Sequence, residues 1–263
     1  MAKIVISNTE DLVRAYDDFL KSIASSKGLL ERQSDCGPSK RVPLIEVSNK
    51  FNPNTILFIG FNPSGADLSY YSTHNGHPYQ KVFIYKGKSN YYKAMEEFAK
   101  ACGFESFSEL DALGIVRKKQ KDVVDAFLNN PSLYSGMLEI FLNALKGLNP
   151  SVVIVANAFV RKLLLACSKK FLYPSSSTVD AITNKLIGLG GINGPFKGFY
   201  SRFVIEPDNA NGGYIMKIDN EKELHLYFSC MLSGQRAIDI GNKENLIWLV
   251  RNYLTTRLSY AES

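Results

Sequence analysis

The chain has 263 residues, of which 45% are hydrophobic and 21% are charged, and its net charge is +6. This length and apolar content suit a globular protein with a sizeable core, and the modest basic excess is compatible with an anionic partner such as nucleic acid. No apolar run approaches the ~18 residues of a membrane span. The N-terminus also lacks the apolar stretch of a signal peptide. We therefore expect a cytoplasmic protein with no membrane partner.

The cysteines and histidines argue against the common metal and cluster sites. The chain has only three histidines, and its four cysteines are too widely separated for the C-x-x-C spacing of a metal or redox site. Reduced, unpaired thiols agree with a cytosolic location. We expect no metal, no iron–sulfur cluster and no other cofactor.

The first part of the chain begins with a helical pattern. Apolar residues at helical spacing predict an amphipathic helix over 9–27, and three prolines predict mostly loop over 31–54. We interpret residues 1–54 as a helical and loop extension of one domain that spans 1–263. The elements that follow are predicted to be a buried strand over 55–60, a polar loop over 64–80 and a short strand over 81–85.

Strand and helix patterns alternate in the rest of the chain. Helices are predicted over 91–102, 121–128, 134–147, 159–169 and 243–254. Strands are predicted over 110–116, 150–156, 200–205, 213–218 and 223–230. The alternation predicts a three-layer α/β/α sandwich with a mostly parallel central sheet. The most continuously apolar strands should be central in that sheet, because both of their faces are covered.

The segment Ile56–Asp67, with the sequence ILFIGFNPSGAD, combines a buried strand with a tight polar turn. Gly60 lets the backbone pass close to a ligand, and Pro63 fixes one backbone angle. In an open α/β sheet, ligands bind beyond the carboxyl ends of the strands. The segment is therefore either a ligand-binding turn or an ordinary turn between a strand and a helix.

A second polar segment follows the strand at 223–229 and reads CMLSGQR over 230–236. Gly60–Gly65 resembles the G-x-N-P-G motif of the mismatch-specific and single-strand-selective branches of the uracil-DNA glycosylase superfamily. Leu232–Arg236 resembles the tail of that superfamily's second motif, H-P-S-P-L-S-x-H-R, and Asn149–Leu163 is similar to its buried strand before the last long helix. The resemblance implies a uracil-DNA glycosylase-like domain. It also implies a monomeric DNA glycosylase that hydrolyses the N-glycosidic bond of a damaged or deaminated base flipped out of single- or double-stranded DNA.

The resemblance also implies roles for individual residues. Asn62 would orient the attacking water, and Asp67 is either an alternative activator of that water or a cap of the next segment. The flipped base would be bound by Gly60, Phe61, Pro63, Ser64, Phe83 and Phe228, with Phe83 either stacking on the base or packing in the core. The DNA would be contacted by Leu232 as a wedge or a buried strand-end residue, and by Ser233, Gln235 and Arg236 at the phosphates.

One departure from the motifs bears on activity. Phe228 stands where the second motif carries His or Asn, so the donor that stabilises the departing base is missing. Asp111 is the nearest polar candidate for the amide that reads uracil on the next strand. The alternatives are a catalytically weak or inactive nucleic-acid-binding module on the same fold, or an unrelated phosphate or nucleotide enzyme. Against the last of these, the chain has neither the P-loop nor the dinucleotide-binding glycine spacing.

Overall fold

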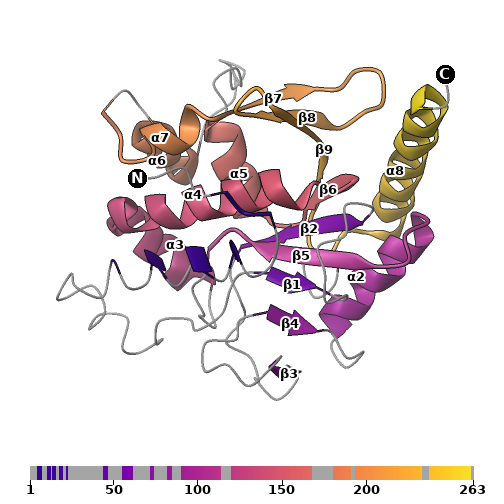
Figure 1. Cartoon of the computed structure of the whole chain (residues 1–263), viewed down its shortest axis with the longest axis horizontal. Helices are drawn as coiled ribbons and strands as arrows, with labels where there is room; N and C mark the ends of the chain where they lie inside the picture. Colours follow the sequence, from indigo (N-terminus) through magenta and orange to yellow (C-terminus); the bar gives the residue numbers. More distant parts are fainter. Residues whose placement is uncertain are drawn as a thin grey trace.

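A mixed β-sheet with helices on both faces forms the centre of the molecule (Figure 1). The computed structural model describes residues 5–7, 11–12, 14–15, 18–19, 22, 44–46, 55–61, 72–73, 82–84, 90–113, 120–167, 180–190, 193–232 and 237–261. In this part of the chain the sheet has nine strands in the order β3-β4-β1-β5-β2-β6-β9-β8-β7. The strands are β1 (Leu44–Glu46), β2 (Ile56–Gly60), β3 (Ser72–Thr73), β4 (Val82–Ile84), β5 (Phe107–Asp111), β6 (Val152–Val155), β7 (Phe203–Pro207), β8 (Tyr214–Ile218) and β9 (Lys222–Phe228).

The four strands β5, β2, β6 and β9 form a parallel block at the centre of the sheet. Antiparallel pairs border it on both sides, where β1 pairs with β5 and β8 pairs with β9. The predicted α/β architecture with a parallel centre is therefore confirmed, and the margins of the sheet are mixed. Strands β2, β6 and β9 are adjacent at its centre, as their continuous apolar runs predicted.

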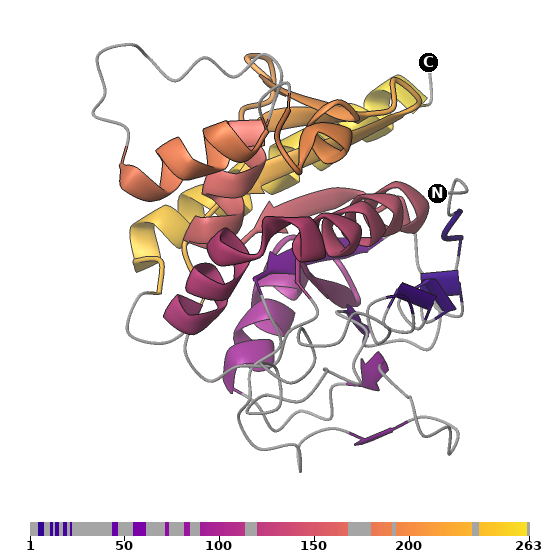
Figure 2. The same cartoon turned by 90° about the vertical axis from the view of Figure 1, so that its left-hand side faces the viewer.

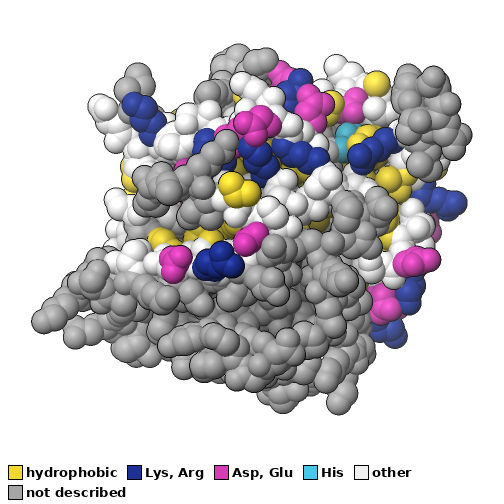
Figure 3. All heavy atoms as spheres, viewed as in Figure 1, with side chains coloured by type: hydrophobic (Ala, Val, Ile, Leu, Met, Phe, Trp, Pro, Cys, Tyr) yellow, Lys and Arg dark blue, Asp and Glu magenta, His cyan; other side chains and the backbone are white. Residues whose placement is uncertain are grey.

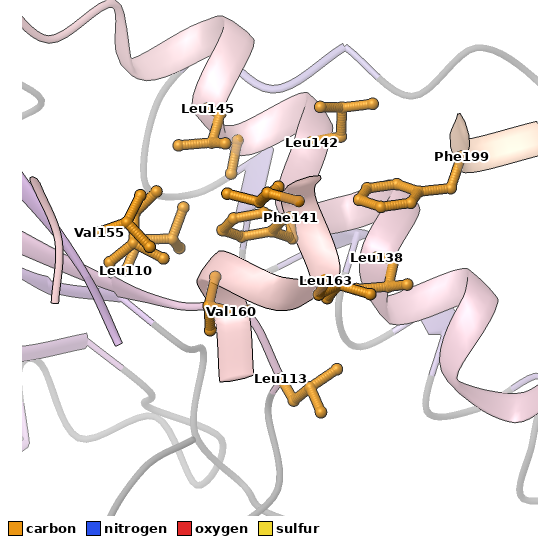
Figure 4. Close-up of a cluster of buried hydrophobic side chains, with 14 of the residues drawn as sticks. Leu110, Leu113, Leu138, Phe141, Leu142, Leu145, Val155, Val160, Leu163 and Phe199 are labelled. Carbon is orange, nitrogen blue, oxygen red and sulfur yellow. The ribbon is translucent and has the colours of Figure 1, made fainter. Parts of the chain in front are cut away.

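Side chains that alternate along the strands contribute to two hydrophobic cores, one on each face of the sheet. In β2, Leu57 and Ile59 face one core, whereas Ile56 and Phe58 face the other. The first core packs on α3 (Gln120–Asn129), α4 (Pro131–Leu148), α5 (Ala158–Cys167), α6 (Ala181–Leu189) and α7 (Lys197–Tyr200), and the second packs on α2 (Asn90–Ala101) and α8 (Ile240–Ala261). Figure 4 shows side chains of β5, β6, α4, α5 and α7 meeting in the first core.

The N-terminal residues that the structure describes also belong to this body. Residues 11, 12, 14, 15, 18, 19 and 22 are helical, and Leu12 and Ala15 are buried in the first core. A Cβ atom on Gly147 would lie 1.7 Å from the carbonyl oxygen of Ile6, so the glycine lets the N-terminal segment pass directly over α4. Figure 2 shows the indigo N-terminal residues beside the end of this helix.

The structure corrects several predicted bounds. The strand predicted over 110–116 has the wrong bounds, because β5 begins at Phe107 and ends at Asp111; residues 114–119 lie outside the described part of the chain. Residues 31–54 were predicted as mostly loop, and the short strand β1 lies within them. Helix α8 begins before the predicted residue 243 and extends to Ala261. Helices α6 and α7 were not predicted from the sequence.

Candidate functional site

The carboxyl ends of the four central parallel strands lie together at one edge of the sheet. Backbone hydrogen bonds continue past the strand ends, from Ala112 N to Gly60 O (3.1 Å) and from Ser229 N to Val155 O (2.9 Å). Both segments that resemble active-site motifs leave the sheet here, since the first follows β2 and the second follows β9. Only β6 separates these two strands. This edge is where a ligand would bind in an open α/β sheet.

Two carboxyl groups are buried beside the end of β2. Glu109 and Asp111 lie on β5, opposite Phe58 and Gly60 in the parallel register. A Cβ atom on Gly60 would lie 2.3 Å from Asp111 Oδ1 and 3.0 Å from Glu109 Oε1. The carboxyl groups thus occupy the space above the Gly60 backbone that any other residue would fill. A glycine is required here because of this close approach.

Burial changes the acidity of Glu109. Removal from water disfavours its charged form and raises the pKa of Glu109 to about 7, although hydrogen bonds from Tyr91 and Tyr92 oppose the shift. Tyr91, on the first turn of α2, donates its hydroxyl to Glu109 Oε1 at 2.8 Å. A carboxyl group with such a pKa exchanges its proton near neutral pH, which suits acid–base chemistry.

Two further polar side chains lie at the same edge. Asn157, just after β6, caps helix α5, because its Oδ1 accepts hydrogen bonds from the backbone of Phe159 (2.9 Å) and Val160 (3.2 Å). Ser229, just after β9, is buried, and its hydroxyl has no hydrogen-bond partner among the described residues. A buried hydroxyl without a partner is unusual in a folded protein and is available to a bound molecule.

The structure describes some of the predicted site residues and not others. Asn62, Pro63, Ser64, Asp67, Ser233, Gln235 and Arg236 lie outside the described residues. Gly60 lies at the edge, under the carboxyl groups described above. The backbone of Phe83 lies on β4, and β1 and β5 separate that strand from β2. The backbone of Phe83 therefore does not lie next to that of Gly60 in the sheet.

The remaining three predicted residues have side chains packed against other residues. Phe61 is buried and its ring lies 4.6 Å from that of Phe159, between centroids. Phe228 is half-buried, with its ring edge-on to Tyr214 at 5.0 Å. Leu232 is 6% exposed and belongs to the core under α8. In this arrangement Leu232 would have to leave the core to enter DNA as a wedge.

Sequence reasoning missed Glu109 and its partner Tyr91. The signal for Glu109 was the five-residue run Phe107–Asp111. Its two acidic residues are two positions apart, so they lie on the same face of a strand. We placed the strand too late because acidic residues are depleted from strands. The hydrogen bond to Tyr91 joins two elements and has no local signature.

Comparisons with known proteins add no assignment to this geometry. No protein-family model, curated protein or solved structure matches the chain. Within the described ranges, no group of three or more His, Cys, Asp or Glu side chains is placed to hold a metal ion. None of the helices described is both long and apolar enough to cross a membrane.

Proposed function

We propose that the protein is a DNA glycosylase that hydrolyses the N-glycosidic bond of a damaged or deaminated base. The observation that carries the proposal is the shared edge of the strands that precede the two motif-like segments. They follow β2 and β9, which are parallel to β6 between them and end at the same edge of the sheet. In our proposal one flipped nucleotide contacts both segments.

The residues at this edge suit the charges of the reaction. Bond cleavage builds positive charge on the sugar and negative charge on the departing base. In our proposal Asn62 orients the attacking water, and backbone N–H groups of the turn 61–65 stabilise the base. The Asp111 carboxylate, beside Gly60, supplies negative charge near the sugar or accepts a hydrogen bond from the base. Glu109 can exchange a proton close to neutral pH.

A second candidate is a nucleic-acid-binding module on the same fold. Phe228 occupies the position of the polar residue in the second motif, and its ring packs on Tyr214. A site without that donor stabilises a leaving base poorly. Binding with little or no chemistry is consistent with this packing.

The test is a panel of oligonucleotides that each carry one deaminated or alkylated base, in single- and double-stranded form. The full-length protein should produce abasic sites in at least one of them, detected by strand cleavage in alkali. Asp111→Asn should lower the rate at least tenfold, whereas Lys185→Gln on α6, an exposed residue on the other face of the sheet, should leave it unchanged. If no base is released at high enzyme concentration over long times, the glycosylase proposal fails and the binding module is favoured.

A further inference from the structure

The two carboxyl groups beside Gly60 differ from the acidic groups on the protein surface. On the face shown in Figure 3, acidic and basic side chains of the described residues lie among one another. Glu109 and Asp111 are instead 3% and 5% exposed, and among the described residues no cation pairs with Glu109. The position of a Cβ atom on Gly60 lies 2.3 Å from Asp111 Oδ1 and 3.0 Å from Glu109 Oε1, so these oxygens are close together. Ionisation of one carboxyl group therefore disfavours ionisation of the other.

The surroundings of the pair make Glu109 the proton donor and leave the negative charge to Asp111. Among the described residues, the titratable groups around Glu109 are Tyr91 and Tyr92 of α2 and Asp111 of its own strand, whereas β1 and β2 place apolar residues opposite it. Burial raises the pKa of Glu109 to about 7, against the hydrogen bonds from both tyrosines. A large fraction of Glu109 therefore keeps its proton near neutral pH. In enzymes, two titratable groups with such different environments act as the acid and the base.

A buried hydroxyl without a partner lies in the same row of the sheet. The parallel register aligns Asp111 with Gly60 and, one position beyond the paired residues of β6 and β9, continues to Ala156 and Ser229. The row shares the face of the second core, because the residues two positions earlier on β2, β6 and β9 belong to that core. Ser229 is 9% exposed, and its hydroxyl has no hydrogen-bond partner among the described residues. The backbones of Asp111 and Ser229 are three strand spacings apart, roughly 14 Å, which is the scale of one nucleotide.

We propose, on the basis of the proposed glycosylase function, that Glu109 is the general acid and Asp111 the general base, and that the excised base is a deaminated purine. The Glu109 proton moves to a ring nitrogen of the purine, and the bond from C1′ to the base breaks with its electron pair on the base, which leaves neutral. The oxygen of a water molecule bonds to C1′, and its proton passes to the Asp111 carboxylate. That proton then returns to Glu109, whose oxygen lies close to that of Asp111. The hydroxyl of Ser229 donates to the sugar–phosphate at the far end of the row.

A proton donor suits a purine better than it suits uracil. The purine ring has a nitrogen, N7, whose lone pair accepts a proton and so allows the base to leave neutral. Uracil leaves as an anion, which requires a hydrogen-bond donor at its oxygen, and the polar residue that the second motif places there is replaced by Phe228. Hypoxanthine, the deaminated form of adenine, keeps N7 free. A guanine methylated at N7 already carries a positive charge and needs no acid.

That difference between hypoxanthine and 7-methylguanine provides the test. Oligonucleotides that carry one of the two bases are assayed for abasic sites with the full-length protein. Glu109→Gln should slow hypoxanthine release about a hundredfold and 7-methylguanine release less than about threefold, because only the first needs the acid. Asp111→Asn should slow both, because water attacks in both reactions. Glu105→Gln, at an exposed position just before β5, is the matched control and should release both bases as the wild type does.

The pH profile gives a second readout that a structural role of Glu109 would not change. Hypoxanthine release by the wild type should fall as the pH rises above about 7, where Glu109 loses its proton. Glu109→Gln should abolish this fall. Tyr91→Phe removes a hydrogen bond that lowers the pKa of Glu109, so the fall should move to higher pH.

The outcomes separate this assignment from the glycosylase proposal. Equal losses on both substrates, or a pH profile that Glu109→Gln leaves unchanged, would overturn the role of Glu109. Release of uracil or 7-methylguanine without release of hypoxanthine would overturn the choice of substrate, and the protein would still be a glycosylase. No release from any substrate would overturn both proposals. Circular dichroism of each variant would check that the fold is intact.

Discussion

Glu109 is the residue whose environment departs furthest from what its type prefers. It lies in the middle of the sheet, and among the described residues its hydrogen-bond partners are the hydroxyls of Tyr91 and Tyr92, not cations. Burial of a carboxyl group disfavours ionisation, so the folded protein holds the proton of Glu109 more tightly than the unfolded chain does. Such an arrangement costs stability at neutral pH, which is a cost commonly found at functional sites.

This residue gives a prediction about pH. Because the pKa of Glu109 is raised from 4.5 to about 7, its contribution favours folding at low pH and is lost as the pH rises through that interval. Glu109→Gln should abolish this dependence. The free energy of unfolding of Glu109→Gln, minus that of the wild type, should be larger at pH 8 than at pH 4.5. We expect this increase to be on the order of 2–3 kcal/mol. Urea unfolding at both pH values measures the difference. Glu105→Gln, at an exposed position, should follow the wild type, and a pH-independent difference for Glu109→Gln would contradict the assignment.

His225 should respond to pH in the opposite direction. It is buried, stacked on Tyr253 with 3.8 Å between the ring centroids, and its Nδ1 lies 3.3 Å from Asp208 Oδ2. Burial lowers the pKa of His225, while Asp208 and the backbone of Gly212 oppose the shift. The unfolded chain therefore takes up the proton first, and stability is lost as the pH falls below about 6.5.

Replacing His225 with Phe should keep the stacking and remove this loss. The free energy of unfolding of His225→Phe, minus that of the wild type, should then rise as the pH falls from 7 to 5. Thermal or urea unfolding across that range measures the trend. A constant difference would show that His225 has the same pKa in both states. The hydrogen bonds that Asp208 accepts from Ala210 and Asn211 keep its carboxylate paired in the variant.

Among the elements, the hairpin of β8 and β9 is held to helix α4 by an ion network. Arg202, just before β7, donates to both carboxylate oxygens of Asp219, at 2.9 and 2.6 Å, and to Glu139 Oε2 at 2.7 Å. Asp219 and Asn220 form the hairpin turn with φ values of 54° and 57°, a left-handed conformation that Asn and Asp tolerate. Pairing with Arg202 lowers the pKa of Asp219 to about 2.

Arg202→Lys should therefore be costly although the charge is kept. A lysine cannot donate from the planar, fork-shaped guanidinium to two carboxylates at once. We expect the free energy of unfolding to fall by about 1–3 kcal/mol, as for other partly buried charges that lose hydrogen bonds. Chemical denaturation measures it. Lys217→Met breaks the more exposed pairs with Glu206 and Glu223 and should cost less than about 0.5 kcal/mol. Equal costs for the two variants would argue against the network.

The elements also show what the sequence could and could not predict. The places of β2 and β6 in the sheet were predictable, because their sequences are apolar on both faces and a central parallel strand is covered on both faces. The start of β5 was not predicted because its acidic residues are untypical of a strand. Strand β1 was not predicted because it has three residues and lies in a proline-rich segment. The pairing of β4 with β1 depends on contacts between distant segments and has no local signature. The site was predictable as an edge of the sheet, whereas the partners of Glu109 were not.

At the scale of the whole molecule, a change at the edge of the sheet should affect both the proposed chemistry and the stability of the fold. Gly60→Ala would push a methyl group against the carboxyl group of Asp111, so one of the two must move. We expect base release to fall at least tenfold and the free energy of unfolding to fall by about 1–3 kcal/mol, as for other overpacked cores.

The matched control is Gly188→Ala on α6, where an added methyl group meets no atom within 4 Å. It should leave base release unchanged and stabilise the helix by up to about 1 kcal/mol. If Gly60→Ala releases bases at the wild-type rate, the carboxyl group of Asp111 beside it takes no part in the chemistry.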